Sequence, residues 1–146
     1  MVTITKKFVI RILLLAAVSA ICALADKCGG NCPSDRCTSC PCGRQTSMVN
    51  IDSSCRRSSI WKTTSCTCIV RNESGGNANA MMQNKDGTMD VGLWQINQRN
   101  WASCNGGRPP CDIQSNLACA EKVFNWGRKT WKFWATCGKC GVCNTA

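Results

Sequence analysis

The sequence predicts a disulfide-rich α+β fold in which helices pack beside a small antiparallel β-hairpin, with a cleft between them. Three observations predict this fold. Cysteines are dense after the first 25 residues. Apolar side chains recur near helical spacing in residues 61–73 and again in a segment that starts at Asp112. Residues 79–97 place a strong turn signal between two short segments, which is typical of a hairpin.

The first 25 residues have the layout of a secretory signal peptide. An apolar run from Ile12 to Leu24 follows a basic start and ends beside Ala23 and Ala25, small residues of the kind found at cleavage sites. The run is too short to span a bilayer comfortably, although an uncleaved anchor or a buried helix is the alternative. We therefore expect a soluble, monomeric protein without stable membrane insertion, secreted outside the cell or into the lumen of a phagosome or lysosome.

Cysteine usage indicates an oxidising compartment. Fifteen cysteines are present, and cleavage after Ala25 removes Cys22 and leaves an even fourteen, enough for seven bridges whose connectivity the spacing does not reveal. Residues 26–55 read as a looped segment held by its own bridges, and residues 56–146 as the catalytic domain. The spacing of Cys37 and Cys40 also suits a zinc half-site, but secretion favours a disulfide, so no metal is expected.

Charge and composition narrow the chemistry. Without the three basic residues of the leader, 15 basic residues outnumber eight acidic ones, which favours anionic polymers or surfaces such as a bacterial envelope. The cations are scattered, so we do not expect nucleic acid as a partner. The chain has no histidine, which excludes Ser-His and Cys-His catalysis and histidine metal sites. Acid–base chemistry would depend on carboxylates, with no cofactor, and Glu73 and Glu121 are the only glutamates.

The elements place two carboxylates across a cleft. The helix over residues 61–73 should stop at Gly75 and Gly76, so Glu73 stands at its end. The turn at residues 84–87 makes residues 79–97 a hairpin whose second strand carries Asp90. The second helix takes Asp112 as its N-cap, ends at Gly127, and precedes a short segment with two tryptophans.

Paired carboxylates in unlike surroundings suit glycoside hydrolysis. One acid must stay protonated to give its proton to the leaving oxygen, and an apolar environment achieves this by raising its pKa. The other must stay ionised to attack or support the positive anomeric carbon. Glu73 follows an apolar stretch, whereas Asp90 lies in a polar hairpin near Asn84 and Asp86. Each acid alone is more often a solvated surface group or a backbone cap.

The amino-acid sequence of this region resembles that of the catalytic region of C-type lysozymes. The resemblance covers residues 66–137 and includes the 17-residue spacing from Glu73 to Asp90. Its motifs are Glu73-Ser74-x-x-Asn77-x-x-Ala80, Asn84-x-Asp86-Gly87-x-x-Asp90-x-Gly92-x-x-Gln95-Ile96-Asn97, Asp112-Ile113, Cys119-Ala120-Glu121-Lys122 and Trp131-x-x-Trp134 before Cys137.

The resemblance implies a lysozyme-like fold and hydrolysis of the β-1,4 glycosidic bonds of bacterial peptidoglycan, with chitin oligosaccharides as a further candidate substrate. It gives Glu73 the role of general acid and Asp90 that of nucleophile or ion stabiliser, the type case of this chemistry. It implies a bridge between Cys68 and Cys137. It also implies a set of substrate-binding residues: Asn84, Gln95, Asn97, Trp101 and Trp131. Among these, the resemblance gives the apolar ring of Trp131 the role of keeping the acid protonated.

Departures from the family pattern leave two alternatives open. Asn100-Trp101 stands where the family often carries two tryptophans, and residues 26–55 have no counterpart. One alternative is a lytic transglycosylase, which needs Glu73 but no second carboxylate and leaves a 1,6-anhydro sugar end. The other is a non-catalytic cationic protein that kills bacteria or binds carbohydrate.

Overall fold

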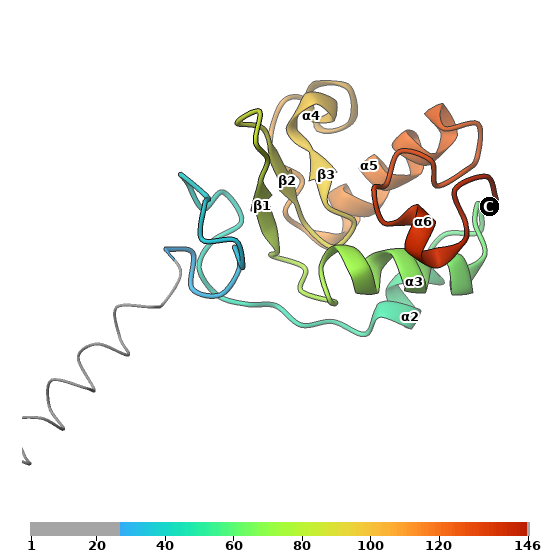
Figure 1. Ribbon diagram of the computed structural model, residues 1–146, viewed down its shortest axis with the longest axis horizontal. Coiled ribbons are helices and arrows are strands. Elements are labelled where there is room, and N and C mark those ends of the chain that lie inside the picture. Colours follow the sequence, from blue (N-terminus) through green and yellow to red (C-terminus); the bar gives the residue numbers. More distant parts are fainter. Residues whose placement is uncertain (1–26, 146) are drawn as a thin grey trace, which may run out of the picture.

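A computed structural model describes residues 27–145, so the predicted signal peptide at residues 1–25 lies outside the described residues. Helices pack beside a small antiparallel sheet, which confirms the α+β prediction (Figure 1). The elements in chain order are α2 (Ile51–Cys55), α3 (Thr63–Glu73), β1 (Met81–Gln83), β2 (Met89–Val91), β3 (Ile96–Asn97), α4 (Gln98–Asn105), α5 (Ile113–Trp126) and α6 (Cys137–Cys140).

The predicted hairpin is present and gains a third strand. The strand order is β1-β2-β3, and Asp90 in the middle strand faces Met82 on one side and Asn97 on the other. The Gly87 N–H donates to the carbonyl of Asn84 at 3.1 Å, and Gly87 has φ +82°, a conformation that favours glycine. The tight turn thus aligns the strands and places Asp90 between two neighbours.

The main helix of the site, α3, ends at Glu73 as the sequence predicts. Cys66, Ile69 and Val70 form its buried face. The Ser74 N–H still donates to the carbonyl of Val70, and the chain then turns away at Gly75 with φ +62°. Glu73 therefore projects from the last turn of a helix that the core holds in place.

The core beneath the sheet is a cluster of aromatic rings. Trp61 lies 5.0 Å from Trp131 and 5.5 Å from Phe124, centroid to centroid, and Trp134 packs on Trp131 at 4.8 Å. The Trp134 indole N–H donates to the carbonyl of Trp94 at 2.9 Å. These contacts join the segment after α5 to α3 and the sheet, so the two sides of the molecule share one core.

A buried asparagine connects the sheet to α5. Asn116 donates its amide N–H groups to the carbonyls of Val91 and Pro110, and its side-chain oxygen accepts from the Trp94 N–H. A Cβ on Gly92 would lie 2.1 Å from the Asn116 amide nitrogen, and Gly92 has φ +80°. Glycine is therefore required at residue 92 for the sheet to approach α5.

Seven disulfide bonds pair all fourteen cysteines of residues 27–145, the number that the cysteine count allows. The bridges are Cys28–Cys40, Cys32–Cys37, Cys42–Cys111, Cys55–Cys66, Cys68–Cys140, Cys104–Cys119 and Cys137–Cys143.

Two cysteine predictions need correction. The predicted Cys68–Cys137 bridge is wrong, because Cys68 pairs with Cys140 and Cys137 pairs with Cys143. Residues 26–55 are also not held by their own bridges alone, since Cys42 and Cys55 pair with cysteines outside the segment. The segment lies beside β1 and then runs under the sheet to α2 (Figure 1).

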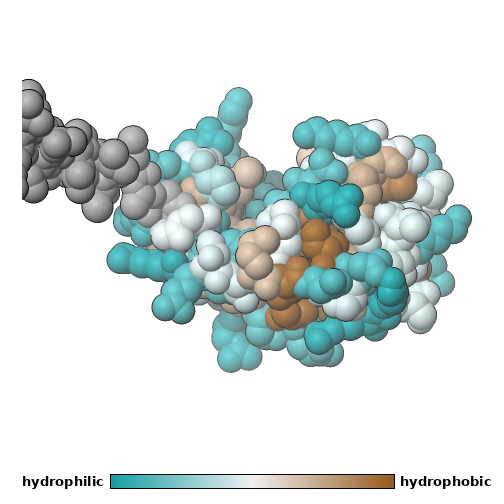
Figure 2. Space-filling view, turned by 90° about the horizontal axis from the view of Figure 1, so that it is seen from below, coloured by the Kyte–Doolittle hydropathy of each residue, from teal (hydrophilic) through white to brown (hydrophobic). Residues whose placement is uncertain are grey.

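The face that carries α2 and α3 is largely polar, with a small central area where apolar side chains gather (Figure 2). Val49 and Ile51, which lead into α2, are half-buried against the core. Among residues 27–145, no helix combines the length and the apolar character that crossing a membrane requires.

Candidate active site

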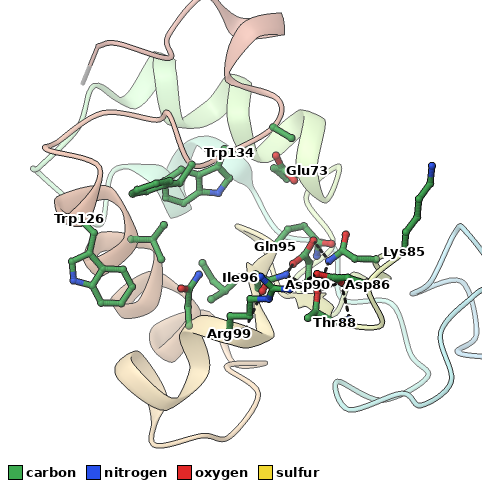
Figure 3. Close-up of a pocket in the computed structure, with 16 residues that line it drawn as sticks. Glu73, Lys85, Asp86, Thr88, Asp90, Gln95, Ile96, Arg99, Trp126 and Trp134 are labelled. Atoms are coloured by element: carbon green, nitrogen blue, oxygen red, sulfur yellow. Dashed lines mark hydrogen bonds and ion pairs between the residues drawn. The ribbon is translucent and has the colours of Figure 1, made fainter.

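A cleft of about 980 Å³ separates the helices from the hairpin, and both predicted catalytic carboxylates line it. Glu73 projects from the end of α3, and Asp90 from β2 in the facing sheet (Figure 3). Trp126 at the end of α5 and Trp134 line the same cleft. The structure therefore brings Glu73 and Asp90 into one cavity from opposite walls.

Glu73 is largely buried and shares a hydrogen bond with a residue far along the chain. The Thr136 hydroxyl donates to its Oε1 at 2.5 Å. Burial raises the pKa of Glu73 above its ordinary value, and the charge of Asp90 raises it further. The Thr136 hydrogen bonds and the charge of Lys139 act in the opposite direction. The net rise favours the protonated form that a general acid needs.

Asp90 is held by two side-chain amides. Asn84 Nδ2 donates to its Oδ2 at 2.9 Å, and Asn97 Nδ2 donates to its Oδ1 at 2.7 Å. Burial raises the pKa of Asp90 above its ordinary value, these amides lower it, and the nearby charge of Asp86 raises it. The two carboxylates thus differ in their hydrogen-bond partners, because Glu73 accepts from one hydroxyl and Asp90 accepts from two amides. Burial raises the pKa of both.

The amide donors of Asn84 and Asn97 are engaged within the protein. Each Nδ2 also donates to the hydroxyl of Thr88, at 3.2 Å and 3.1 Å. The Asn97 side-chain oxygen caps α4 by accepting from the Arg99 N–H. Both residues line the cleft, as expected for sugar contacts, but their N–H groups hold Asp90 in place.

Gln95 lines the cleft with one atom free for a ligand. Its Nε2 donates to the carbonyls of Ala80 and Gly92 at 3.0 Å and 2.8 Å, so its carbonyl oxygen points elsewhere. Among residues 27–145, no group donates a hydrogen bond to that oxygen. Gln95 has φ +48°, an unfavourable conformation for a residue with a side chain. The strain is consistent with a side chain placed for binding.

Two predicted tryptophans lie in the core instead of on the cleft. Trp101 is 7% exposed and its indole N–H donates to the carbonyl of Ile96 at 3.0 Å. Trp131 is fully buried among Trp61, Phe124 and Trp134. The ring that lines the cleft with Glu73 is that of Trp134 (Figure 3).

The predictions for Trp131 and Cys137 are wrong in the same way: in both cases a residue three positions later in the sequence occupies the predicted position. The residues that fill these positions are Trp134 and Cys140, each three places further along the chain. The chain turns after α5 through Arg128 and Lys129, whose φ values of +59° and +58° are left-handed. That backbone path decides which of two equally apolar rings faces the cleft, and no side-chain pattern reveals it.

Several residues at the site were not predicted, among them Thr136, Trp126 and Phe133. Trp126 and Phe133 line the cleft and are 47% and 58% exposed. Trp126 follows Val123 at helical spacing, and a large aromatic ring on the exposed flank of that helix was the available signal. Thr136 lies 63 residues from its partner Glu73, so the sequence offers no signal for that contact.

The Thr136 hydrogen bond yields a pH-dependence prediction. Thr136→Val removes an interaction that lowers the pKa of Glu73, so that pKa should rise further. A general acid works only while protonated, so the alkaline limb of kcat/KM against pH should move to higher pH. The profile is measured on the peptidoglycan substrate that the sequence resemblance implies, with Thr145→Val as the control. An unchanged or lowered alkaline limb contradicts the assignment.

Comparison with known proteins agrees with this geometry. Residues 51–136, more than half of the chain, match the model of a family described as a lysozyme-like domain. Lysozyme C of Crax fasciolata is 33% identical over 84 residues, which cover 46% of this chain and 64% of that protein. Lysozyme c-1 of Anopheles gambiae is 31% identical over 78 residues, covering 46% of this chain and 56% of that protein. The chain thus spans less than two thirds of the length of either relative. The match over residues 51–136 shows that the chain belongs to the lysozyme-like domain family.

Proposed function

We propose that this protein is a secreted lysozyme that hydrolyses the β-1,4 glycosidic bonds of bacterial peptidoglycan. The observation that carries the proposal is the pair Glu73 and Asp90, which line one cleft from opposite walls with different hydrogen-bond partners. Membership of the lysozyme-like family supports a glycosidase. The seven disulfide bonds support an oxidising, extracellular compartment.

The mechanism assigns a different role to each carboxyl group. Glu73, whose pKa burial raises, gives its proton to the glycosidic oxygen as the bond from that oxygen to the anomeric carbon breaks. Asp90, positioned by the amides of Asn84 and Asn97, attacks the anomeric carbon in its ionised form or stabilises the positive charge there. Glu73, now ionised, takes a proton from water as the water oxygen bonds to the anomeric carbon. Where Asp90 has bonded to that carbon, this bond breaks in the same step and Asp90 leaves as the carboxylate.

The cleft suits a glycan chain. Trp126 and Phe133 expose apolar ring faces along it, and sugar rings present C–H groups that pack on such faces. Lys85 and Arg99 line the same cleft, where Arg99 forms an ion pair with Asp86 at 2.8 Å. We propose Trp126 as the sugar platform that the buried Trp101 does not provide.

The decisive test separates hydrolysis from lytic transglycosylation. Asp90→Asn should lower the rate of wall cleavage by roughly 10²-fold or more, because the positive charge at the anomeric carbon loses its counter-ion. The products of the unmodified protein should carry reducing ends, identified by mass spectrometry. Asp52→Asn, on α2 and outside the cleft, is the control. Products with 1,6-anhydro ends and full activity in Asp90→Asn support the transglycosylase instead.

A further inference from the structure

A second cavity adjoins the cleft on the other side of Glu73. It measures about 410 Å³ and shares Glu73 and Gln95 with the cleft, whereas Asp90 lines only the cleft. Part of its lining comes from the cysteine-rich N-terminal segment, through Pro33, Thr46 and Met48. The segment for which the sequence suggests no role thus lies beside the proposed catalytic acid.

The N-terminal segment is fixed in this position. Asn31 is fully buried, its side-chain oxygen accepts from Asn77 Nδ2 at 2.9 Å, and its backbone carbonyl accepts from the Met81 N–H at 2.7 Å. The Cys42–Cys111 bridge joins the segment to the residue that precedes the N-cap of α5. The cavity wall is therefore built into the fold, and its shape does not depend on a loose tail.

The positions of the two carboxylates indicate which side of the scissile bond the cavity would bind. In glycoside hydrolysis the acid lies beside the leaving oxygen, while its partner faces the anomeric carbon. Asp90 lines the cleft alone, so the sugar that carries the reacting anomeric carbon lies there. The leaving sugar must continue past Glu73, and the adjoining cavity is the space next to Glu73 that Asp90 does not share.

The lining of the cavity fits an N-acetylated sugar. Met48 is 67% exposed and Met82 39%, and their flexible thioether side chains adapt to irregular apolar shapes such as an acetamido methyl group. Pro33 and Ala80 add apolar surface. The free carbonyl oxygen of Gln95 is positioned to accept a hydrogen bond from an amide N–H.

We propose that residues 28–49 complete the binding site for the N-acetylated sugar on the leaving side of the scissile bond, as one wall of a cavity whose other walls are residues 73–82 and Gln95. The cysteine-rich segment is then a specificity-determining part of the enzyme in addition to a structural one. This inference rests on the proposed glycosidase function, because the acid role of Glu73 assigns the direction of the substrate.

The kinetic test compares two substrates. The double variant Met48→Ala/Met82→Ala should lower kcat/KM on an N-acetylglucosamine hexasaccharide by about tenfold, the effect of a lost apolar contact in a pocket. On an aryl β-glycoside the leaving group has no acetamido methyl for these side chains to contact, so the loss should be smaller than on the hexasaccharide. Trp126→Ala, on the other side of Glu73, should lower activity on both substrates. If the double variant loses kcat/KM equally on both substrates, or on neither, the inference is overturned.

A binding test works without catalysis. In the Glu73→Gln protein carrying ¹³C-methyl methionine, saturation with the hexasaccharide should shift the methyl signals of Met48 and Met82. The signal of Met89, which is buried in β2 and does not line the cavity, should stay unchanged. Binding without shifts at Met48 and Met82 overturns this inference and leaves the proposed function intact. If wild-type protein cleaves neither substrate, or the Glu73→Gln variant stays active, the proposed function itself fails.

Discussion

Glu73→Gln should lower wall-cleaving activity by roughly 10²–10⁴-fold, the usual contribution of a positioned general acid. Glutamine keeps the size of the side chain and its contact with Thr136 but has no proton to give to the leaving oxygen. Activity is measured by release of reducing sugars from peptidoglycan. The matched control is Glu121→Gln, because Glu121 is the only other glutamate and lies on α5 outside the cleft. If Glu73→Gln retains full activity, Glu73 is not the general acid, and a non-catalytic protein that binds carbohydrate becomes the better interpretation.

The same substitution should stabilise the folded protein at neutral pH. Burial raises the pKa of Glu73 in the folded state, so folding favours the protonated form and ionisation above that pKa costs stability. Glutamine removes this cost. The melting temperature of Glu73→Gln should exceed that of the wild type at neutral pH, and the difference should shrink as the pH falls and Glu73 becomes protonated. A lower melting temperature for the variant across the whole pH range contradicts the burial argument.

Removal of the Cys42–Cys111 bridge should have a large effect on stability, because among the bridges of residues 27–145 only Cys68–Cys140, which spans 72 residues, closes a longer loop. The bridge spans 69 residues, and closing a loop of that length reduces the entropy of the unfolded chain, which corresponds to about 4 kcal/mol in the free energy of unfolding. The double variant Cys42→Ala/Cys111→Ala leaves no unpaired thiol. Its free energy of unfolding is measured by denaturant titration.

The matched control for this prediction is Cys32→Ala/Cys37→Ala. That bridge spans only five residues and should contribute about 2 kcal/mol. Equal losses from the two bridges, or a larger loss from the short one, contradict the loop-length argument. Because Cys42 anchors the N-terminal segment, its loss should also weaken hexasaccharide cleavage more than aryl glycoside cleavage, in line with the proposed leaving-side site.

Features with local signals were predictable. Gly75 and Gly76 end α3 just after Glu73, the turn closed by Gly87 defines the hairpin, and the Asp112 side chain caps α5 by accepting from the Ser115 N–H. Each signal acts over a few residues, through glycine conformation or a capping hydrogen bond, and therefore survives without knowledge of the rest of the fold. The short helices α2, α4 and α6 lack such strong periodicity and were not predicted.

Contacts between distant segments were not predictable. Trp131 and Trp134 are three residues apart and equally apolar, so either ring satisfies the pattern, and the turn at Arg128 decides which one lines the cleft. The partner of Cys68 depends on the same backbone path. Trp101 was expected on the cleft surface, but its hydrogen bond to Ile96 and its burial place it in the core.

The sequence by itself determined the chemistry available to this protein. The lack of histidine, the two glutamates and the 17-residue spacing from Glu73 to Asp90 left a carboxylate pair as the candidate site. Only the tertiary structure decided the surroundings of that pair: the Thr136 hydroxyl on Glu73, the two amides on Asp90 and the N-terminal segment beside the acid. The physical reason is that pKa values and cavity walls depend on burial and through-space contacts, which join residues that the chain order keeps far apart.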